Sequence, residues 1–278
     1  MVTVAVVFLV TAACSSSSKG LSPTSTSAPL KPRIYAALGD SYAAGEGLAP
    51  FEADSGNCHR SPQAHPRLVA AQEGSTLDFA PCTGATVDAV VRAGGQLASV
   101  DPRSDLVTVT VGGNDLGFAE VIGDCVIDAD PCSHLDAQVE ASLAKLGPAL
   151  EAAYRQIKAR APGARLLVVG YPQVVADPAK VAYDACSAVN SPIPGRRVGA
   201  DDAVWLRQKG AQLSDVIQGA AKAAGASYVD VAGDFAGHEA CSADPWLTGV
   251  VLTNLLASFH PTAAGQAELA RLVIRALA

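Results

Sequence analysis

Four short apolar runs limit the fold that this chain can adopt. They are rich in β-branched side chains, show no regular polar alternation, and span Ile34–Leu38, Leu106–Val111, Arg165–Val169 and Ser227–Val231. Strands that are buried on both faces have this composition. A weaker fifth run covers Leu77–Ala80. The runs therefore predict a sheet that is covered on both sides.

Long amphipathic segments separate these runs. Between Ser133 and Ala161 apolar residues recur at steps of three and four, which is the spacing of one helical stripe: Leu135, Val139, Leu143, Leu146, Leu150, Tyr154 and Ile157. Ser133 is the expected N-cap of this helix, and Pro162 follows its end. Two further helices are predicted over Asp201–Ala224 and Thr262–Ala276. This alternation indicates a parallel sheet with helices on both faces.

The N-terminal segment has the composition of an export signal. The apolar stretch Val2–Ala13 is too short to span a membrane and is typical of a signal-peptide core. Cys14 follows small residues, as in a bacterial lipobox, where the cysteine becomes lipidated. Thr11 replaces the usual leucine, and no Lys or Arg precedes the apolar stretch. An ordinary signal peptide cut near or beyond Ala13 is the alternative.

A tether follows this signal. Residues 15–32 are mostly Ser, Thr and Pro, with almost no large apolar side chains, so they cannot pack a core. We expect a signal in residues 1–14, a flexible tether in 15–32 and one folded domain in 33–278. The protein is then exported, and is either anchored to the cell envelope through Cys14 or extracellular.

Charge and cysteine content restrict the partners and the compartment. A formal net charge of −7, without a basic run, argues against nucleic acid. Seven cysteines are many for a reduced cytosolic protein. Six lie in the predicted domain and could pair in fifteen ways: Cys58, Cys82, Cys125, Cys132, Cys186 and Cys241.

No metal site is expected. The cysteines form no CxxC pair, and the histidines His59, His65, His134 and His238 have no ligand spacing. Asp124, Asp128 and Asp130 lack the glycine and terminal glutamate of a calcium loop. We interpret this acidic segment as a solvated loop.

Three motifs carry the groups needed for acyl transfer. GDSYAAGEG (Gly39–Gly47) and GGND (Gly112–Asp115) each follow a predicted strand, and SFHPTAAGQ (Ser258–Gln266) lies near the C-terminus. They supply a hydroxyl, a side-chain amide and an imidazole, which serve as nucleophile, oxyanion donor and base in ester hydrolysis. Because sites in parallel sheets gather at the carboxyl ends of strands, Ser41 and Asn114 should share one edge.

The order of these motifs resembles that of the SGNH (GDSL-type) hydrolases, in particular the secreted, disulfide-bearing lipases and esterases of actinobacteria. The resemblance covers Arg33–Ala278 and implies a flavodoxin-like, three-layer α/β/α fold without a cofactor. It implies that Ser41 is the nucleophile and His260 the base. The oxyanion hole would use the backbone N–H groups of Ser41 and Gly84 with the side-chain amide of Asn114.

The resemblance also implies a disulfide pattern and exposes one departure. The pairs would be Cys58–Cys82, Cys125–Cys132 and Cys186–Cys241. The family usually has an aspartate three residues before the histidine, and here that residue is Ala257. The backbone carbonyl of Ala257 is the expected substitute, and a distant acid, Asp230 or Asp234, is the alternative.

The sequence thus predicts a monomeric serine esterase or lipase that acts on ester or lipid substrates. The loops Ala49–Gly56 and Asp177–Arg197 are expected to shape the acyl pocket. A carbohydrate or glycolipid deacetylase, or an acyltransferase of the cell envelope, is the alternative among enzymes. A surface lipoprotein that binds without catalysis is the alternative from another class.

Overall fold

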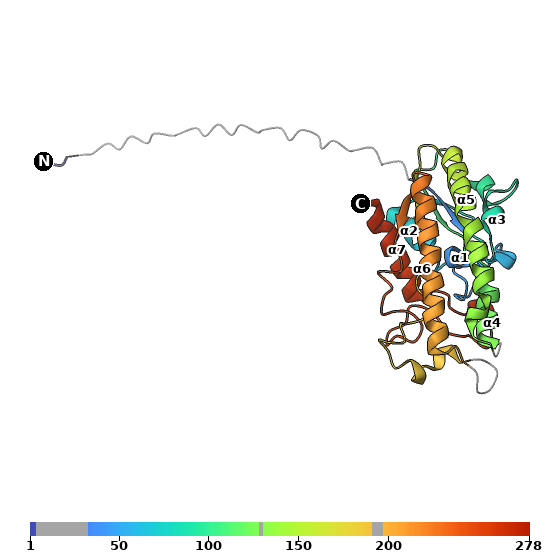
Figure 1. Cartoon of the computed structure of the whole chain (residues 1–278). Coiled ribbons are helices and arrows are strands. Elements are labelled where there is room, and N and C mark those ends of the chain that lie inside the picture. Colours follow the sequence, from blue (N-terminus) through green and yellow to red (C-terminus); the bar gives the residue numbers. More distant parts are fainter. Residues whose placement is uncertain (4–32, 128–129, 191–196) are drawn as a thin grey trace. The chain divides into compact units, whose positions relative to one another are not determined.

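The structure is a computed structural model that describes residues 1–3, 33–127, 130–190 and 197–278 (Figure 1). The chain divides into two units, Met1–Lys31 and Pro32–Ala278. The second unit holds every helix and strand described below. Cys14 lies outside the described residues, as do the rest of the predicted signal from residue 4 on and the whole predicted tether, residues 15–32. Among the described helices, none has the length and apolar character that a membrane span requires.

Five parallel strands form the sheet in the described part of the chain. They are β1 (Ile34–Gly39), β2 (Thr76–Phe79), β3 (Leu106–Thr110), β4 (Arg165–Val169) and β5 (Ser227–Val229), in the order β2-β1-β3-β4-β5. All five predicted runs are confirmed, although β5 ends two residues earlier than predicted. This is the flavodoxin-like strand order, in which the chain changes direction across the sheet between β1 and β3.

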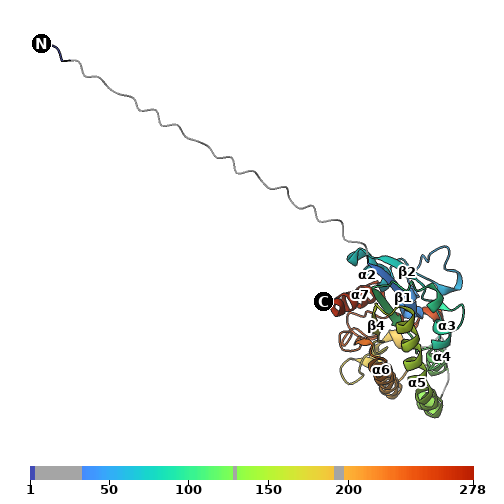
Figure 2. The ribbon, with the colours of Figure 1, turned by 90° about the horizontal axis from the view of Figure 1, so that it is seen from above.

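Helices cover both faces of the sheet, as Figure 2 shows from above. One face packs against α3, α4, α5 and α6, and the other against α2 and α7. The helices are α1 (Ser41–Ala44), α2 (His65–Glu73), α3 (Val87–Val91), α4 (Phe118–Ile127), α5 (Asp136–Arg160), α6 (Ala200–Ala223) and α7 (Ala263–Leu277). Successive residues of β1 alternate between the faces: Ala36 and Leu38 join the first core, and Tyr35 and Ala37 the second. The three-layer α/β/α prediction is confirmed.

The longest helix, α5, begins later than the sequence indicated. Ser133 was the expected N-cap, but it lies inside a 3₁₀ turn, Cys132–Leu135, and the α-helix starts at Asp136. The backbone N–H of Cys132 donates to the Asp202 carboxylate at 2.8 Å, and its sulfur is bonded to Cys125. These two attachments hold the segment in the tighter turn, so the Ser133 prediction is wrong.

Three disulfides join the six domain cysteines in the pairs that the resemblance implied, Cys58–Cys82, Cys125–Cys132 and Cys186–Cys241.

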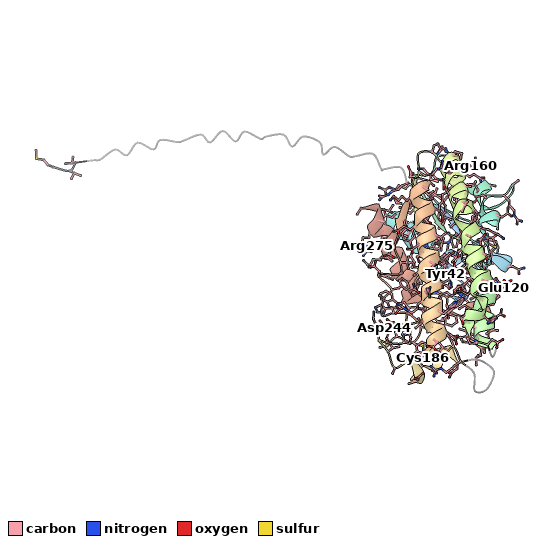
Figure 3. The ribbon with its side chains drawn as sticks, in the orientation of Figure 1. Tyr42, Glu120, Arg160, Cys186, Asp244 and Arg275 are labelled. Atoms are coloured by element: carbon pink, nitrogen blue, oxygen red, sulfur yellow. A yellow bond between two sulfur atoms is a disulfide. The ribbon has the colours of Figure 1, made fainter. Side chains whose placement is uncertain are left out.

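Charged side chains such as Arg160, Asp244 and Arg275 are exposed around the domain. Tyr42, next to the GDS serine, lies in the interior (Figure 3).

Candidate active site

Ser41 sits on a tight turn between β1 and α1. Gly39 has a φ of 134°, and a Cβ there would lie 2.3 Å from the carbonyl oxygen of Thr110 in β3, so only glycine fits. The Asp40 carboxylate then caps the short helix by accepting the Tyr42 N–H at 3.0 Å. This turn carries Ser41 to the carboxyl edge of the sheet.

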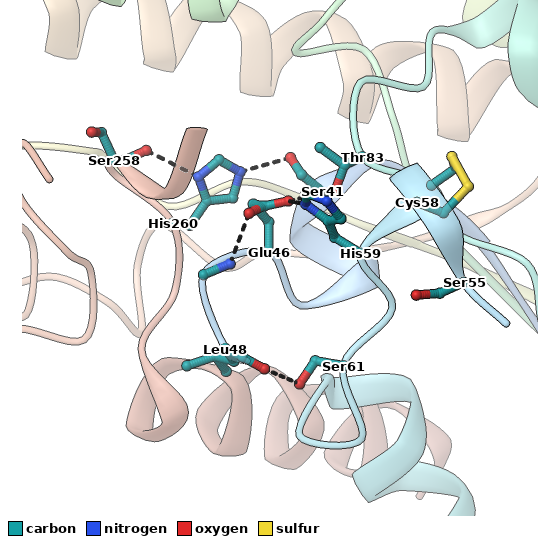
Figure 4. Close-up of polar contacts among 12 residues, drawn as sticks. Ser41, Glu46, Leu48, Ser55, Cys58, His59, Ser61, Thr83, Ser258 and His260 are labelled. Atoms are coloured by element: carbon teal, nitrogen blue, oxygen red, sulfur yellow. Dashed lines mark hydrogen bonds and ion pairs between the residues drawn. A yellow bond between two sulfur atoms is a disulfide. The ribbon is translucent and has the colours of Figure 1, made fainter. Parts of the chain in front are cut away.

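The hydroxyl of Ser41 contacts the imidazole of His260, which comes from the other end of the chain. Ser41 Oγ lies 2.7 Å from His260 Nε2 (Figure 4). On the other side of the ring, Nδ1 lies 3.0 Å from the carbonyl oxygen of Ser258. Since a carbonyl oxygen only accepts hydrogen bonds, Nδ1 carries the proton and Nε2 is free to accept the hydroxyl proton of Ser41.

Burial controls the basicity of His260. Removal of the ring from water lowers the pKa of His260, while the Ser258 carbonyl and the charge of Glu46 partly oppose that shift. The neutral form, which can act as a base, is therefore favoured. Tyr42 packs beside the ring, with ring centroids 5.1 Å apart, and its hydroxyl donates to the Phe259 carbonyl at 2.6 Å.

The carbonyl beside His260 belongs to Ser258 and not to Ala257, so that expectation needs correction. Ala257 ends a 3₁₀ turn, and its carbonyl accepts the Thr248 hydroxyl at 2.7 Å. Phe259 has a φ of 58°, a left-handed conformation that is rare for a bulky residue. The chain turns back there, which brings the carbonyl two residues before His260, and not three, to Nδ1.

Asp230 and Asp234, the two distant acids, make their contacts away from His260. Asp234 pairs with Arg275 at 2.7 Å and Arg271 at 3.3 Å on the surface of α7. Asp230 is exposed, and its carboxylate accepts the Gly233 N–H at 3.4 Å. The ring of His260 makes its described polar contacts with Ser41 and Ser258, so neither acid fills the position of a triad aspartate.

Gly84 and Asn114 lie on the wall of the same cavity as Ser41 and His260. The Asn114 amide donates to the Ala85 carbonyl at 2.9 Å. The next residue of the GGND motif, Asp115, accepts the Val87 N–H at 3.0 Å. Two side chains after β3 therefore hold the loop that contains Gly84. Each amide nitrogen carries two N–H groups, so Asn114 keeps one that the Ala85 contact does not use.

Tyr171, which the sequence analysis did not single out, links two of the motifs. Its hydroxyl donates to the Asp40 carboxylate and accepts the Gly113 N–H at 3.2 Å. Burial raises the pKa of Asp40 to about 7, and the hydrogen bonds from Tyr171 and Tyr42 limit that rise. Tyr171 follows the end of β4, so the edge of the sheet was the available signal, but its partner cannot be read from spacing.

The cavity beside Ser41 is mostly apolar and has a volume of about 310 Å³. Most of its apolar side chains come from α4, α5, α6 and the segment before His260, among them Val121, Ile122, Val126, Val139, Leu206, Leu213, Val250, Leu255 and Leu256. No described residue of Ala49–Gly56 or Asp177–Arg197 lines it. The expectation that those loops shape the acyl pocket is therefore wrong for the part of the chain that is described.

Metal-binding side chains are not gathered anywhere in the described residues: no three of His, Cys, Asp or Glu lie close enough together to hold an ion. Besides polar residues such as Gln173 and Lys209, the cavity wall holds the hydroxyl of Ser41, the imidazole of His260 and the side-chain amide of Asn114. Such a set can perform nucleophilic acyl transfer.

Comparison with known proteins gives a consistent result. A model of the GDSL-like Lipase/Acylhydrolase family matches residues 37–268. Lipase 1 of Streptomyces coelicolor is 36% identical over 235 residues, which cover 84% of this chain and 82% of that protein.

Two solved structures are similar throughout the domain. The extracellular lipase of Streptomyces rimosus is 32% identical, with a TM-score of 0.77 over 88% of this chain and 99% of that one. Phospholipase A1 of Streptomyces albidoflavus is 33% identical, with a TM-score of 0.78 and the same coverage. The strand order, the site geometry and these matches agree: the chain is an ester hydrolase that belongs to the GDSL-like lipase/acylhydrolase family.

Proposed function

We propose that the protein is a serine esterase or lipase in which Ser41 is the nucleophile and His260 the general base and acid. The observation that carries this proposal is the 2.7 Å contact between Ser41 Oγ and His260 Nε2 at the wall of an apolar cavity. A serine hydroxyl is a weak nucleophile until a base accepts its proton, and this contact is the required geometry.

Hydrolysis then proceeds in two half-reactions. Ser41 Oγ attacks the ester carbonyl carbon while its proton passes to His260 Nε2. The bond to the alcohol breaks, and His260 gives that proton to the departing alcohol oxygen. Water attacks the acyl-enzyme in the same way: His260 takes a proton from the water and returns it to Ser41 Oγ as the acid leaves.

The negative oxygen of each tetrahedral intermediate needs hydrogen-bond donors. We assign this role to the backbone N–H groups of Ser41 and Gly84 and to the free amide N–H of Asn114. Their position on one cavity wall supports the assignment. The Ser258 carbonyl fixes the ring of His260 and accepts from the Nδ1 proton when the ring becomes positively charged.

The substrate class follows from the lining of the cavity. Leu213, Val139 and Val126 lie on its α-helical wall, which suits an apolar acyl chain and leaves few partners for sugar hydroxyls. Leu255 and Leu256 are 51% and 56% exposed and also line the cavity, so its mouth is apolar too. We therefore favour fatty acyl esters over carbohydrate esters.

We also propose that the protein is exported, with residues 1–14 as the signal. The lipase of S. rimosus to which it is similar is extracellular, and the sequence before residue 33 has the composition of a signal and tether. Anchoring through Cys14 is part of this proposal. Mass spectrometry of the mature N-terminus tests it: a lipidated N-terminal Cys14 supports anchoring, and an unmodified terminus contradicts it.

The catalytic assignment is tested with nitrophenyl esters of increasing acyl length. Ser41→Ala and His260→Ala should each lower kcat on the order of 10⁴-fold or more, because members of such a unit act together. Ser99→Ala is the matched control, since Ser99 is an exposed serine bonded only to the Gln96 carbonyl. The assignment is wrong if folded Ser41→Ala retains a measurable fraction of wild-type kcat.

A further inference from the structure

Glu46 is a buried carboxylate to which the steps above give no role. It has no exposed surface, and it lies in the GDSYAAGEG motif five residues after Ser41. A buried charge is costly unless several donors compensate it, and an apolar side chain would fill such a site with less desolvation. The burial of the Glu46 carboxylate therefore calls for a functional explanation of its charge.

Three donors hold this carboxylate in place. His59 Nδ1 lies 2.7 Å from Oε2, the Thr83 hydroxyl donates to Oε2 at 2.9 Å, and the Gly47 N–H donates to Oε1 at 3.2 Å. The ring of His59 is itself stacked on Phe51, with centroids 4.6 Å apart. The carboxylate thus accepts hydrogen bonds at both oxygens, as a charged carboxylate prefers.

A disulfide fixes two of these donors. His59 directly follows Cys58 and Thr83 directly follows Cys82, and these cysteines are bonded to each other. The Thr83 N–H also donates to the Cys58 carbonyl at 3.2 Å. The two donors can therefore not drift apart, and the position of the Glu46 carboxylate is set by a covalently closed loop.

Glu46 lies next to the catalytic pair. The Glu46 N–H donates to the Ser41 carbonyl at 3.0 Å, and Figure 4 draws Glu46 between His59 and His260. Among the described carboxylates, Glu46 is the one whose charge raises the pKa of His260. The second buried acid nearby, Asp40, is bonded to Tyr171 and to the Tyr42 N–H instead.

We propose that Glu46 is a positioning residue that stabilises the positively charged imidazole of His260 from a distance, in place of the triad aspartate that this chain lacks. The proposal rests on the role proposed above for His260. When His260 takes the proton of Ser41, a positive charge forms in a site with little water, where a fixed negative charge acts strongly. The Ser258 carbonyl orients the ring, and Glu46 adds the charge that a carbonyl cannot supply.

The other groups that face these residues do not provide that charge. Ser41 and Tyr42 from α1, and the Ser258 carbonyl, surround the His260 ring as neutral groups. His59 is the titratable group that faces Glu46, and it contacts Oε2 through Nδ1.

The test is Glu46→Gln, which keeps the shape but has one acceptor oxygen, so it can still accept from Thr83 or from Gly47 but not from both. On a soluble short-chain ester we expect kcat to fall roughly ten- to a hundredfold with little change in KM. The acid limb of the pH profile of kcat/KM should move to lower pH, because His260 loses a neighbouring negative charge. Thermal unfolding confirms that each variant is folded.

Three comparisons make the result decisive. Glu52→Gln is the matched control, since Glu52 lies in the same loop but pairs with Arg67 at 2.7 Å, and it should leave kcat and the pH profile unchanged. Thr83→Val removes one donor but keeps the charge, so its acid limb should remain at the wild-type pH. Glu46→Asp also keeps the charge, and its limb should stay near the wild-type position even where kcat falls.

Three results would overturn the proposal. The first is an unchanged kcat and acid limb in Glu46→Gln. The second is a reduced kcat with an acid limb that does not move, and the third is an acid limb that moves equally in Glu46→Asp. In the last two cases Glu46 would only brace the loop. If the proposed function itself is wrong, Ser41→Ala will retain activity, and this result distinguishes that failure from a failure of the Glu46 proposal.

Discussion

The two halves of the catalytic pair are held by different kinds of contact. On the nucleophile side, side chains fix the turns: Tyr171 binds Asp40, Asn114 binds Ala85, and Thr83 binds Glu46. On the base side, the contact that orients the His260 ring comes from the main chain, the Ser258 carbonyl, while the side chains of Tyr42 and Thr248 bind the neighbouring backbone.

This difference predicts how the activity should respond to substitutions on each side. A side-chain contact can be deleted by substitution, whereas a carbonyl contact remains whichever side chain the residue carries. We therefore expect large effects from single changes on the nucleophile side, whereas no substitution of the Ser258 side chain should remove the carbonyl that orients His260.

Apart from Ser41 itself, the largest effect on the nucleophile side is expected for Asn114→Ala. Loss of one oxyanion donor should lower kcat on the order of 10²–10³-fold and leave KM nearly unchanged, because the donor acts mainly in the transition state. Asn254→Ala, an exposed asparagine of the base-side segment, is the control. A raised KM with an unchanged kcat would move Asn114 from the oxyanion hole to substrate binding.

The next largest effect is expected when the Cys58–Cys82 disulfide, which lies beside the turn that carries Ser41, is removed. Replacing Cys58 and Cys82 together by alanine should lower the free energy of unfolding by about 2–5 kcal/mol. It should also lower kcat, because Thr83 and the adjacent Gly84 lose their anchor. The Cys186–Cys241 pair, which does not line the cavity, gives the comparison: its removal should cost stability, measured by denaturant unfolding, without changing kcat. Equal loss of kcat in both pairs would contradict the local role.

A smaller effect is expected at the apolar mouth on the base side. Leu255→Ser with Leu256→Ser should raise KM for a long-chain ester roughly tenfold, the value of burying part of two leucines, and leave a short-chain ester unaffected. Leu252→Ser is the matched control, since Leu252 is 59% exposed but does not line the cavity. An equal change for both esters would mean that these leucines act on the fold of the segment and not on the acyl chain.

The smallest effect is expected for the two distant acids. Asp230→Asn and Asp234→Asn should each change kcat by less than about twofold, because the surface pairs of Asp234 with Arg271 and Arg275 contribute little to stability. Steady-state kinetics on the folded variants provide the measurement. A thousandfold loss in either variant would show that a carboxylate supports His260 after all.

The sequence predicted the sheet well because buried parallel strands have a distinctive composition. The three long helices were also found, since each repeats its apolar stripe over several turns. Short elements gave no such signal: α1 has four residues and α3 has five, and such segments owe their helical form to caps and to neighbouring packing.

The motifs located Ser41 and His260, but the details between them depend on tertiary structure. The Ser258 carbonyl contacts His260 across Phe259, which has a left-handed backbone, and no pattern of side chains predicts such a conformation. Tyr171 lies 131 residues from Asp40, and Thr83 lies 37 residues from Glu46. Glu46 stood inside a quoted motif, yet its burial and partners become visible only in the folded chain.

The central claim is that Ser41 is activated by a histidine whose ring is oriented by the main chain, and fluorophosphonate labelling with peptide mass mapping tests it most directly. We expect one phosphonylated peptide, containing Ser41, to form at the same rate in the wild type, Asp230→Asn and Asp234→Asn, and far more slowly in His260→Ala. Labelling at another serine, or an unchanged rate in folded His260→Ala, would contradict the account.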